Sequence, residues 1–343
     1  MPSRLVFIGR RQAILQKMKL PPLGPNSLLL RSQVSLISTG TELTAFGHCF
    51  EQGTHWDAWV KYPFQPGYAT VARIAQAGKN IRDARIGHRV VARVPHASHH
   101  VVKETQIAFV PDTISNEEAV WFALAKIAFA GMLTANLPPG ARVAVVGAGP
   151  LGQTVVRWAA ISAAAEIVVI DRNGKRLALA RRGGATGTIA RALEEEIDSI
   201  IVNSGGCRPE VIFDCTGNPS VLPRALRLVA DHGKIIILGD TGFPSAQHLT
   251  SDVIWRGVSI LGAHDLHTSS SKWEDEREIF QLFFHFLSNR SFSTAHLVTH
   301  RFDPQQAQQA YLLAEERKGD TCGILFNWNN KNHFKEFRYE ADR

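Results

Sequence analysis

Three glycines near the middle of the chain stand at the spacing of a phosphate-binding turn. The segment reads GAGPLG, follows the apolar run RVAVV directly and opens a stretch with helical periodicity. In such a turn Gly147 permits the tight bend, Gly149 lets the main chain approach a pyrophosphate, and Gly152 allows the helix to pack closely on the strand. The first helical turn, which holds Pro150 and Leu151, points its N-terminus at the same phosphates. We therefore predict a dinucleotide site here.

An acidic residue at the end of the next apolar run indicates the form of the dinucleotide. Asp171 closes the run IVVID, where a carboxylate can accept hydrogen bonds from the hydroxyls of an adenosine ribose. A 2′-phosphate at that place would face a negative charge, so Asp171 favours NAD over NADP. Arg172 and Arg176 are near enough in sequence to offset part of this repulsion. The structural alternative is that Asp171 caps a turn.

Two further loops are predicted to lie beside the nicotinamide half of the cofactor. They follow the apolar runs EVIFD and KIII and are made of glycine and small polar residues. Ligands of open α/β sheets bind at the carboxyl ends of the strands, so these loops should reach the cofactor. Ordinary turns are the alternative. The residues predicted to contact the cofactor there are Cys215, Thr216, Gly217, Leu238, Gly239 and Asp240.

The elements that must hold these loops alternate between strands and helices from residue 141 onward. This alternation indicates a parallel sheet of the doubly wound kind with helices on both faces, so the fold class is α/β. The predicted strands cover 141–147, 166–171, 185–190, 210–217, 234–240 and 258–264. The predicted helices cover 152–164, 175–184, 219–233 and 271–290, and the second and third of them are expected to close on glycine.

The first third of the chain has a different texture. Residues 4–111 contain short β-rich runs separated by Gly and Pro, which predict a β-rich lobe. The stretch 117–136 has helical spacing and an acidic first turn, and we expect it to bridge the two lobes. Near the end, a strand over 296–302, a helix over 303–319 and a strand over 322–328 are predicted to return to the first lobe.

Composition places the chain among folded proteins with two domains. Its 343 residues exceed the length at which a single core usually stops growing, and 45% are hydrophobic against 20% charged. The net charge is +7, but Lys and Arg are scattered, which favours a solvated surface over a nucleic-acid patch. The start does not resemble a leader, and no uninterrupted apolar run has the length of a membrane helix. We therefore expect a cytoplasmic protein with neither a nucleic acid nor a membrane as partner.

The order of these elements, together with several local motifs, resembles the medium-chain dehydrogenase/reductase superfamily over residues 4–328. The motifs are LISTGTEL at 36–43, PFQPGYATVARI at 63–74, IGHRV at 86–90, GAGPLG with IVVID, and LVTHRFDPQQAQQAY at 297–311. The resemblance implies a GroES-like catalytic domain over 1–120, a Rossmann domain over 121–290, and a return to the catalytic domain over 291–343. Within the superfamily, the texture is similar to a zinc-free branch of sugar, cyclitol and bacteriochlorophyllide dehydrogenases.

The same resemblance implies that the catalytic zinc site is lost. Zinc-dependent relatives have motifs like GICGSD and GHE, and Thr39 and Tyr68 stand where the Cys and His ligands would be. Phe122 falls near the third ligand position, and these side chains cannot replace a His or a thiolate as zinc ligands. The four cysteines form no CxxC pair, and the structural zinc lobe is missing. We therefore predict no metal, and we count Thr39 among the residues beside the cofactor.

Without zinc, hydrogen-bond donors must remove the alcohol proton or polarise the carbonyl. Thr41 matches the Ser/Thr of the GICGSD-like motif and is predicted to relay the substrate proton. Tyr68 is predicted to donate to the substrate oxygen, with filling of the vacated volume as the alternative. Lys126 on the bridging helix is its predicted partner, which would lower the pKa of the phenol, and a surface lysine is the alternative.

The segment between Gly47 and Tyr68 is expected to overhang the substrate cleft, and it is rich in aromatic and polar residues. Such a mixture suits a ring with several hydroxyls, so a sugar or cyclitol is the predicted substrate. A tetrapyrrole hydroxyethyl group is the second choice, and a surface excursion is the structural alternative. The residues predicted to contact substrate are Trp56, Asp57, His96 and His264.

Two other classes of function remain open at this point. A zinc-free member of the superfamily can be an NAD(P)H-dependent reductase of quinones or activated double bonds, although Asp171 and the Thr41 relay argue against it. A nucleotide-binding protein without turnover is the third reading. The run VSILGAH at 258–264 is a predicted sheet edge, and relatives pair this strand across a two-fold axis, so a homodimer is expected.

Overall fold

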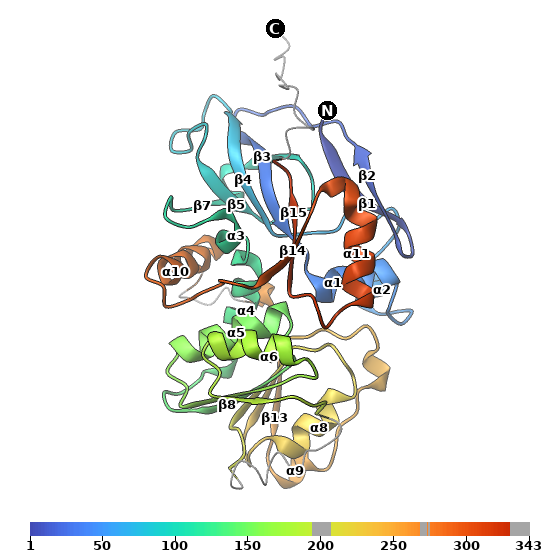
Figure 1. The fold of residues 1–343 in the computed structure, drawn as a ribbon, viewed down its shortest axis with the longest axis vertical. Coiled ribbons are helices and arrows are strands. Elements are labelled where there is room, and N and C mark those ends of the chain that lie inside the picture. The colour runs from blue at the N-terminus through green and yellow to red at the C-terminus, as the bar shows by residue number, and fades with distance from the viewer. Residues whose placement is uncertain (194–206, 268–272, 274, 330–343) are drawn as a thin grey trace.

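A computed structural model describes residues 1–193, 207–267, 273 and 275–329, and in these ranges the chain forms two lobes joined by a central helix (Figure 1). The upper lobe of Figure 1 is built on a seven-stranded sheet of order β14-β15-β3-β4-β5-β7, with β6 also paired to β3. A separate hairpin, β1 with β2, lies beside it. The bounds are β1 Ser3–Gly9, β2 Gln12–Lys17, β3 Ser27–Leu36, β4 Thr70–Ala77, β5 Arg89–Ala92, β6 His99–Lys103, β7 Ile107–Phe109, β14 Val298–Phe302 and β15 Gly323–Asn327.

The lower lobe holds a six-stranded sheet of order β10-β9-β8-β11-β12-β13 in which every pair is parallel. The chain order reverses between β8 and β11, so the loops after these two strands diverge and leave a crevice at the carboxyl edge of the sheet. The predicted cofactor loops leave the sheet at this edge. The bounds are β8 Arg142–Val146, β9 Glu166–Ile170, β10 Gly187–Ile189, β11 Val211–Asp214, β12 Lys234–Ile237 and β13 Ser259–Gly262.

Helices cover the parallel sheet and connect it to the upper lobe. Local signals explain several of their ends: the Ser115 and Glu118 side chains form a capping box at the start of α3, and α6 begins at the N-cap Asn173 and ends at Gly183. The bounds are α1 Thr39–Gly47, α2 His55–Trp59, α3 Asn116–Ala119, α4 Phe122–Ala135, α5 Pro150–Ile161, α6 Gly174–Arg182, α8 Val221–Leu228, α9 Asp252–Trp255, α10 Glu276–Ser288 and α11 Ala307–Glu316.

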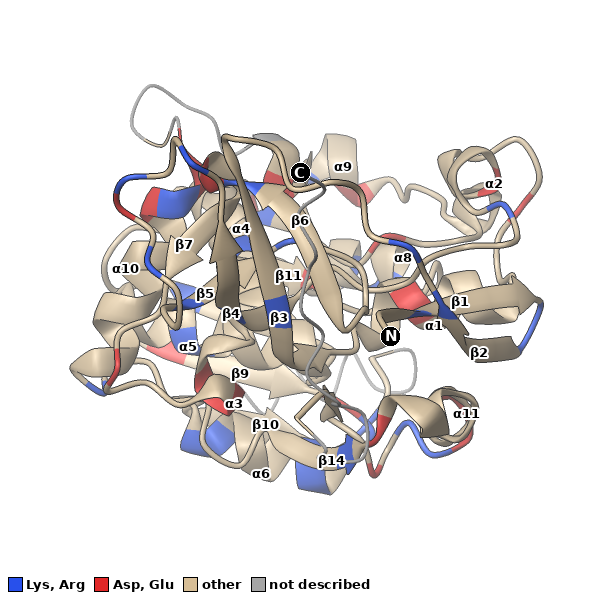
Figure 2. Ribbon diagram, turned by 90° about the horizontal axis from the view of Figure 1, so that it is seen from above, with Lys and Arg blue, Asp and Glu red and all other residues tan. Residues whose placement is uncertain are grey.

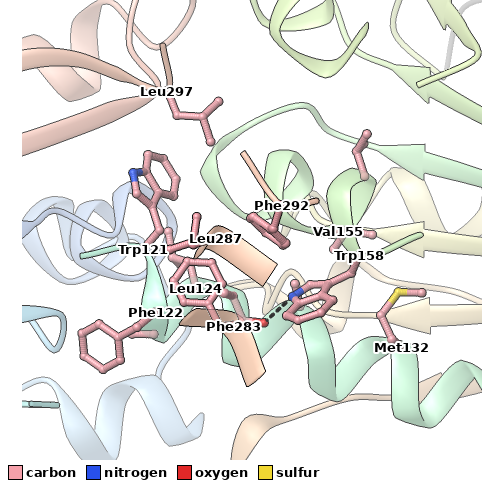
Figure 3. Close-up of a cluster of buried hydrophobic side chains, with 14 of the residues drawn as sticks. Trp121, Phe122, Leu124, Met132, Val155, Trp158, Phe283, Leu287, Phe292 and Leu297 are labelled. Carbon is pink, nitrogen blue, oxygen red and sulfur yellow. Dashed lines mark hydrogen bonds between the residues drawn. The ribbon is translucent and has the colours of Figure 1, made fainter. Parts of the chain in front are cut away.

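The largest core surrounds α4, which lies between the lobes. Figure 3 shows Trp121, Phe122 and Trp158 among leucines and phenylalanines from helices that are far apart in sequence. Phe122 is fully buried, and its ring meets that of Phe280 edge to face at 4.8 Å. The Trp158 indole donates to the Ala125 carbonyl over 2.9 Å. Because apolar side chains surround α4 on nearly all sides, it has the composition of a core helix.

Because α4 is buried in the core, the segment that contains it is apolar enough to resemble a membrane helix in composition. Asn116–Ala135 is apolar enough and long enough to span a membrane, but 72% of its most apolar window is buried inside the protein. In the view from above, lysines and arginines are distributed over many elements, and acidic residues occur among them (Figure 2). This scattered distribution agrees with the one expected from the sequence.

The predicted strands are found with small shifts at their ends, but some elements were missed. Within residues 4–111, helix α1 was not predicted, and the last part of this range forms two short strands, β6 and β7, separated by a turn of 3-10 helix. The helix predicted over 219–233 ends at Leu228, five residues before the expected Gly233, because Val229 takes an extended conformation. Residues 271, 272 and 274 of the helix predicted over 271–290 lie outside the described residues. The domain limits at 120 and 290 stay a prediction.

Candidate active site

The three glycine loops at the carboxyl edge of the parallel sheet pack backbone against backbone. Gly147 has a φ of +91°, and a Cβ on Gly152 would lie 1.8 Å from the Gly147 carbonyl oxygen. A Cβ on Gly239 would lie 2.4 Å from the Gly217 amide nitrogen. Side chains at these positions would push the loops apart. Near Gly149, in contrast, a Cβ would meet only the Arg176 guanidinium, at 3.8 Å, which leaves the approach to this backbone open for a pyrophosphate.

Asp171 holds the shape of this cradle. Its carboxylate accepts from the Ala148 amide over 2.7 Å and from the Asn173 amide over 2.8 Å. The capping role considered from sequence is therefore present. It does not compete with the cofactor role, because a carboxylate has about four acceptor positions and two are used here. The residues of the cradle fit a dinucleotide, with Asp171 on the adenosine side.

The two arginines expected to offset Asp171 are placed differently from each other. Arg176 donates to the Thr321 carbonyl over 2.7 Å and also to the Lys318 carbonyl, so its guanidinium is anchored to the segment before β15. Its Nε and one terminal nitrogen are therefore engaged with a backbone carbonyl, while the other terminal nitrogen lies 3.8 Å from the Cβ position of Gly149. Arg172 is exposed.

Where the nicotinamide half of the cofactor is predicted to bind, the loops after β11 and β12 meet the inserted segment of the upper lobe. The Thr216 hydroxyl donates to Asp214 over 2.6 Å, and burial raises the pKa of the Cys215 thiol well above its usual value, so the thiol stays protonated. His55 Nε2 and Asp240 Oδ2 lie 2.7 Å apart. Asp240 is thus at the rim of the crevice, where it links the two lobes.

A chain of three hydroxyls lies at the start of helix α1. The Tyr68 phenol donates to Ser38 Oγ over 2.6 Å, and Ser38 Oγ lies 3.5 Å from Thr41 Oγ1. Ser38 is the N-cap residue of α1, so partial positive charge from the helix N-terminus acts on these oxygens. Burial raises the pKa of the Tyr68 phenol, while its hydrogen bonds to Ser38 and Thr41 and the charge of Arg93 act in the opposite direction. Tyr68 and Thr41, both predicted, are brought together, and Ser38 joins them.

The cation beside Tyr68 is Arg93, not Lys126. The Arg93 guanidinium carbon lies 5.3 Å from the centre of the Tyr68 ring, and the same guanidinium donates to the Asp265 carboxylate. Lys126 Nζ lies 2.7 Å from Glu276 and 3.6 Å from Asp265. The prediction that Lys126 partners Tyr68 is therefore wrong: its position on α4 directs the ammonium toward α10 and the loop after β13. Burial lowers the pKa of Lys126 and the Glu276 carboxylate opposes that shift.

A buried hydrogen-bond network centred on Glu42 holds the backbone of Ser38 in place. Glu42 is 2% exposed, and its carboxylate accepts from the Ser38 amide over 2.8 Å and from the Tyr311 phenol over 2.5 Å. The same carboxylate lies 3.0 Å from His96 Nε2, whose other ring nitrogen meets Ser35 Oγ at 2.8 Å. His96 is fully buried and both its nitrogens are occupied, so its predicted contact with substrate is wrong.

The inserted loop also differs from its prediction. Trp56 is 4% exposed and packs in the core of the upper lobe near Phe50, so it cannot cover a substrate. Asp57 accepts from the Gly53 amide over 3.0 Å and from Lys61 over 3.1 Å, which makes it a residue that shapes the loop. Hydrogen bonding to Gly53 is the main reason why the pKa of Asp57 is lowered. His264 is exposed beside Asp265 and stays a candidate.

The side chains at the three positions that hold the catalytic zinc in zinc-dependent relatives do not form a zinc site in this chain. Tyr68 presents its phenol to Ser38, Phe122 is in the core, and Thr39 starts α1. Neither a phenyl ring nor a neutral hydroxyl is a zinc ligand of the usual kind. Within the described ranges, no group of three or more His, Cys, Asp or Glu is placed to hold a metal. Arg93 beside Tyr68 would in addition repel a divalent cation.

Comparison with known proteins gives matches to both lobes. A family model described as zinc-binding dehydrogenase matches residues 150–283. L-threonine 3-dehydrogenase of Bacillus licheniformis is 25% identical, over 92% of this chain and 95% of its own length. Sorbitol dehydrogenase of Mus musculus is 24% identical over 96% and 97%. The crystal structure of an Escherichia coli oxidoreductase/dehydrogenase of unknown specificity, involved in membrane biogenesis, has a TM-score of 0.81 at 20% identity and covers 95% of this chain and 99% of that chain.

Proposed function

We propose that this chain, by fold and relatives an NAD(P)-dependent alcohol dehydrogenase of the medium-chain dehydrogenase/reductase superfamily, uses NAD to oxidise a secondary alcohol of a polyhydroxylated molecule without zinc. The predicted resemblance to the superfamily and the predicted fold, a GroES-like domain with a Rossmann domain, are confirmed, while membership of the zinc-free branch stays a prediction. The form of the cofactor, the independence from zinc and the substrate class are the finer parts of the proposal.

The observation that carries the proposal is the hydroxyl chain from Tyr68 through Ser38 to Thr41. The alcohol proton can pass to the Tyr68 oxygen as the phenol proton moves to Ser38 and the Ser38 proton moves to Thr41. Thr41, which is partly exposed, in turn releases its own hydroxyl proton to solvent. Each of the three oxygens then gives up one proton and takes up one, so no charge is left inside the chain. NAD, when bound, would accept the hydride that leaves the same carbon. Reduction of the ketone runs through the same steps in reverse.

The preference for NAD rests on the adenosine side of the cradle. In the proposed binding mode the Asp171 carboxylate would lie at the ribose, so a 2′-phosphate there would meet negative charge, and two nitrogens of the Arg176 guanidinium already donate to a backbone carbonyl. Reductases of quinones or activated double bonds need no relay to take an alcohol proton, so the hydroxyl chain also favours the alcohol reaction.

The substrate class is proposed from the rim and from the relatives. His55, Asp240 and His264 place polar side chains at or near the crevice, where they can bind hydroxyls. A sugar, cyclitol or linear polyol fits such a rim better than a planar tetrapyrrole does. Sorbitol dehydrogenase is among the relatives, which supports the same class.

We further propose a cytoplasmic homodimer that binds neither nucleic acid nor membrane. Strand β13 is the edge of the parallel sheet, and three large apolar side chains in the segment that precedes it in sequence are exposed: Leu249 at 62%, Ile254 at 88% and Trp255 at 84%. An apolar patch beside an open sheet edge favours pairing with a second copy.

The deciding experiment is a steady-state assay of purified protein on two substrate panels, polyols with cyclitols and quinones with enones. Each panel is run with both cofactors, before and after treatment with a chelator. Polyol turnover with NAD that survives chelation and is lost in Tyr68→Phe is the expected result. Turnover confined to the quinone panel, or one zinc per chain whose removal abolishes activity, would contradict the proposal.

A further inference from the structure

Arg93 occupies a position that the proton relay does not by itself explain. It follows strand β5, its guanidinium lies over the Tyr68 ring at 5.3 Å, and it is 24% exposed at the side chain. On its other side it donates to Asp265, which belongs to the loop after β13 in the other lobe and is 4% exposed. The phenol thus has a fixed positive charge beside it, and that charge is held from across the interlobe boundary.

We propose that Arg93 is a positioning residue that supplies, through Tyr68, the positive charge that a zinc ion gives the reacting oxygen in metal-dependent enzymes. This inference rests on the proposed alcohol dehydrogenase function. It adds a residue that acts on Tyr68 without touching the substrate, and it assigns Asp265 the task of holding Arg93 in place.

The charges around Tyr68 make Arg93 the group that acts on it. The Lys126 ammonium lies 2.7 Å from Glu276 of helix α10, whereas the Arg93 guanidinium lies over the Tyr68 ring. Glu42 lies behind Ser38 and opposes Arg93, because a carboxylate disfavours negative charge on the phenol oxygen. Two like cations, Arg93 and Lys126, share Asp265, and this arrangement is stable only while the carboxylate is present.

The positive charge of Arg93 favours negative charge on the Tyr68 phenol oxygen. During oxidation the alcohol proton approaches Tyr68 while the phenol proton leaves, and any lag between the two transfers gives the oxygen partial negative charge. A guanidinium held nearby in a partly desolvated site lowers the energy of that charge without having to reorganise. A zinc ion would stabilise the substrate oxygen directly, whereas Arg93 acts on it indirectly, through the Tyr68 phenol.

The test that needs no substrate follows the ionisation of Tyr68 itself. The chain has four tyrosines, so protein labelled with fluorotyrosine, a more acidic phenol than tyrosine, should give a ¹⁹F spectrum in which Tyr68→Phe identifies one signal. In Arg93→Leu this signal should titrate at higher pH than in the parent. Arg73→Leu, which removes an exposed arginine of strand β4, should leave the midpoint unchanged. An unchanged midpoint in Arg93→Leu, or a Tyr68 signal that titrates in neither protein, would overturn the inference.

Kinetics on the best polyol supply the second arm. Arg93→Leu should lower kcat by about tenfold or more with a smaller change in KM, because the charge acts on the reacting oxygen rather than on binding. Arg93→Lys should restore a large part of kcat and return the phenol midpoint toward that of the parent. Equal losses in Arg93→Lys and Arg93→Leu would mean that the side chain serves packing alone. If the ¹⁹F shift is found but no polyol is turned over, the inference about Arg93 stands and the proposed function fails.

Discussion

His55 Nε2 and Asp240 Oδ2 lie 2.7 Å apart, which fastens the inserted loop of the GroES-like lobe to the carboxyl end of a Rossmann strand. The contact is reinforced nearby, where the Glu51 amide donates to the Gly242 carbonyl over 2.8 Å and Glu51 also accepts from the Ser245 hydroxyl. The loop is therefore held, by contacts to the other lobe, at the end of the crevice where we propose that the nicotinamide binds. Of its aromatic residues, Trp56 is buried in the core of its own lobe, whereas Trp59 is 53% exposed.

We expect His55→Ala to raise KM for the polyol several-fold while leaving stability within about 1 kcal/mol of the parent, because both partners are largely exposed. Steady-state kinetics and denaturant unfolding measure the two quantities. Arg11→Ala, which breaks an ion pair with Glu315 inside the upper lobe, is the matched control and should leave KM unchanged. Equal KM values in His55→Ala and the parent would show that the pair does not order the loop.

Substitutions at the two ends of the hydroxyl chain, Tyr68 and Thr41, should lower kcat by different amounts. Tyr68→Phe should reduce kcat by about 10²-fold or more, since it removes the group that meets the substrate oxygen, and Thr41→Val should reduce it less. Burial raises the pKa of Tyr68, so the rate of alcohol oxidation in the parent should increase with pH and ketone reduction should decrease once the phenol ionises. The Phe variant should lose this dependence in pH–rate profiles. A parent-like profile in Tyr68→Phe would assign the proton to another group.

Cofactor selectivity should depend on Asp171 alone among the three residues considered. Asp171→Ser should weaken NAD binding and narrow its advantage over NADP, as measured by fluorescence titration of the seven tryptophans. Arg172→Ala should change the ratio little, because this side chain is exposed. Tighter binding of NADP than of NAD by the parent protein would refute the assignment.

The exposed apolar patch beside β13 should be covered by a second copy. Replacement of the 84% exposed Trp255 by Glu should convert a dimer to a monomer at micromolar concentration in sedimentation, with no loss of monomer stability. Ile86→Glu, at a 70% exposed position of the other lobe, is the control that should stay dimeric. A parent protein that sediments as a monomer would contradict the dimer.

Two buried histidines on β6 predict acid sensitivity. Burial lowers the pKa of His99 to about 4 and that of His100 to about 3, from 6.5 in the unfolded chain. Between pH 6.5 and those values the unfolded state binds the extra protons, so the free energy of unfolding falls as pH falls. Each histidine contributes a slope of up to about 1.4 kcal/mol per pH unit.

His100→Leu should remove one of these slopes in denaturant titrations between pH 4 and 6.5. The substitution is tolerable because His100 Nε2 is buried with no hydrogen-bond partner among the described residues. His248→Gln, at an exposed position, should keep the slope of the parent. An unaltered slope in His100→Leu would mean that this histidine is solvated.

The sequence was most informative where physical periodicity is strong. Most of the six parallel strands are short apolar runs, and GAGPLG follows one of them, so the cradle and Asp171 could be placed from local signals. Helix α1 was missed because Thr39, Gly40 and Thr41 are weak helix formers, and tertiary contacts stabilise its first turn instead. Glu42 accepts from the Ser38 amide there, a contact that no periodicity predicts.

Errors at the site came from residues whose partners are distant in sequence. Lys126 and Arg93 are 33 residues apart, and which of them reaches Tyr68 depends on Asp265, from the other lobe. His96 was read as a cleft residue because its type suits chemistry, but Glu42 and Ser35 satisfy it inside the core. A signal for Arg93 did exist: it continues strand β5, which pairs with β4 just beyond Tyr68.

The anchoring of Arg176 to the Thr321 carbonyl has a counterpart at the other end of the crevice, in the contact of His55 with Asp240. Beside the first lies a second exposed tie, from Lys175 to Asp320 at 2.6 Å. Polar contacts that are exposed or partly exposed thus join the two lobes at both ends of the crevice, and the buried core around α4 lies between these ends. Opening for cofactor exchange would break these polar contacts and also the Arg93–Asp265 pair, whose carboxylate is 4% exposed. If the core around α4 stayed packed during that opening, cycling between open and closed forms need not cost the protein its fold.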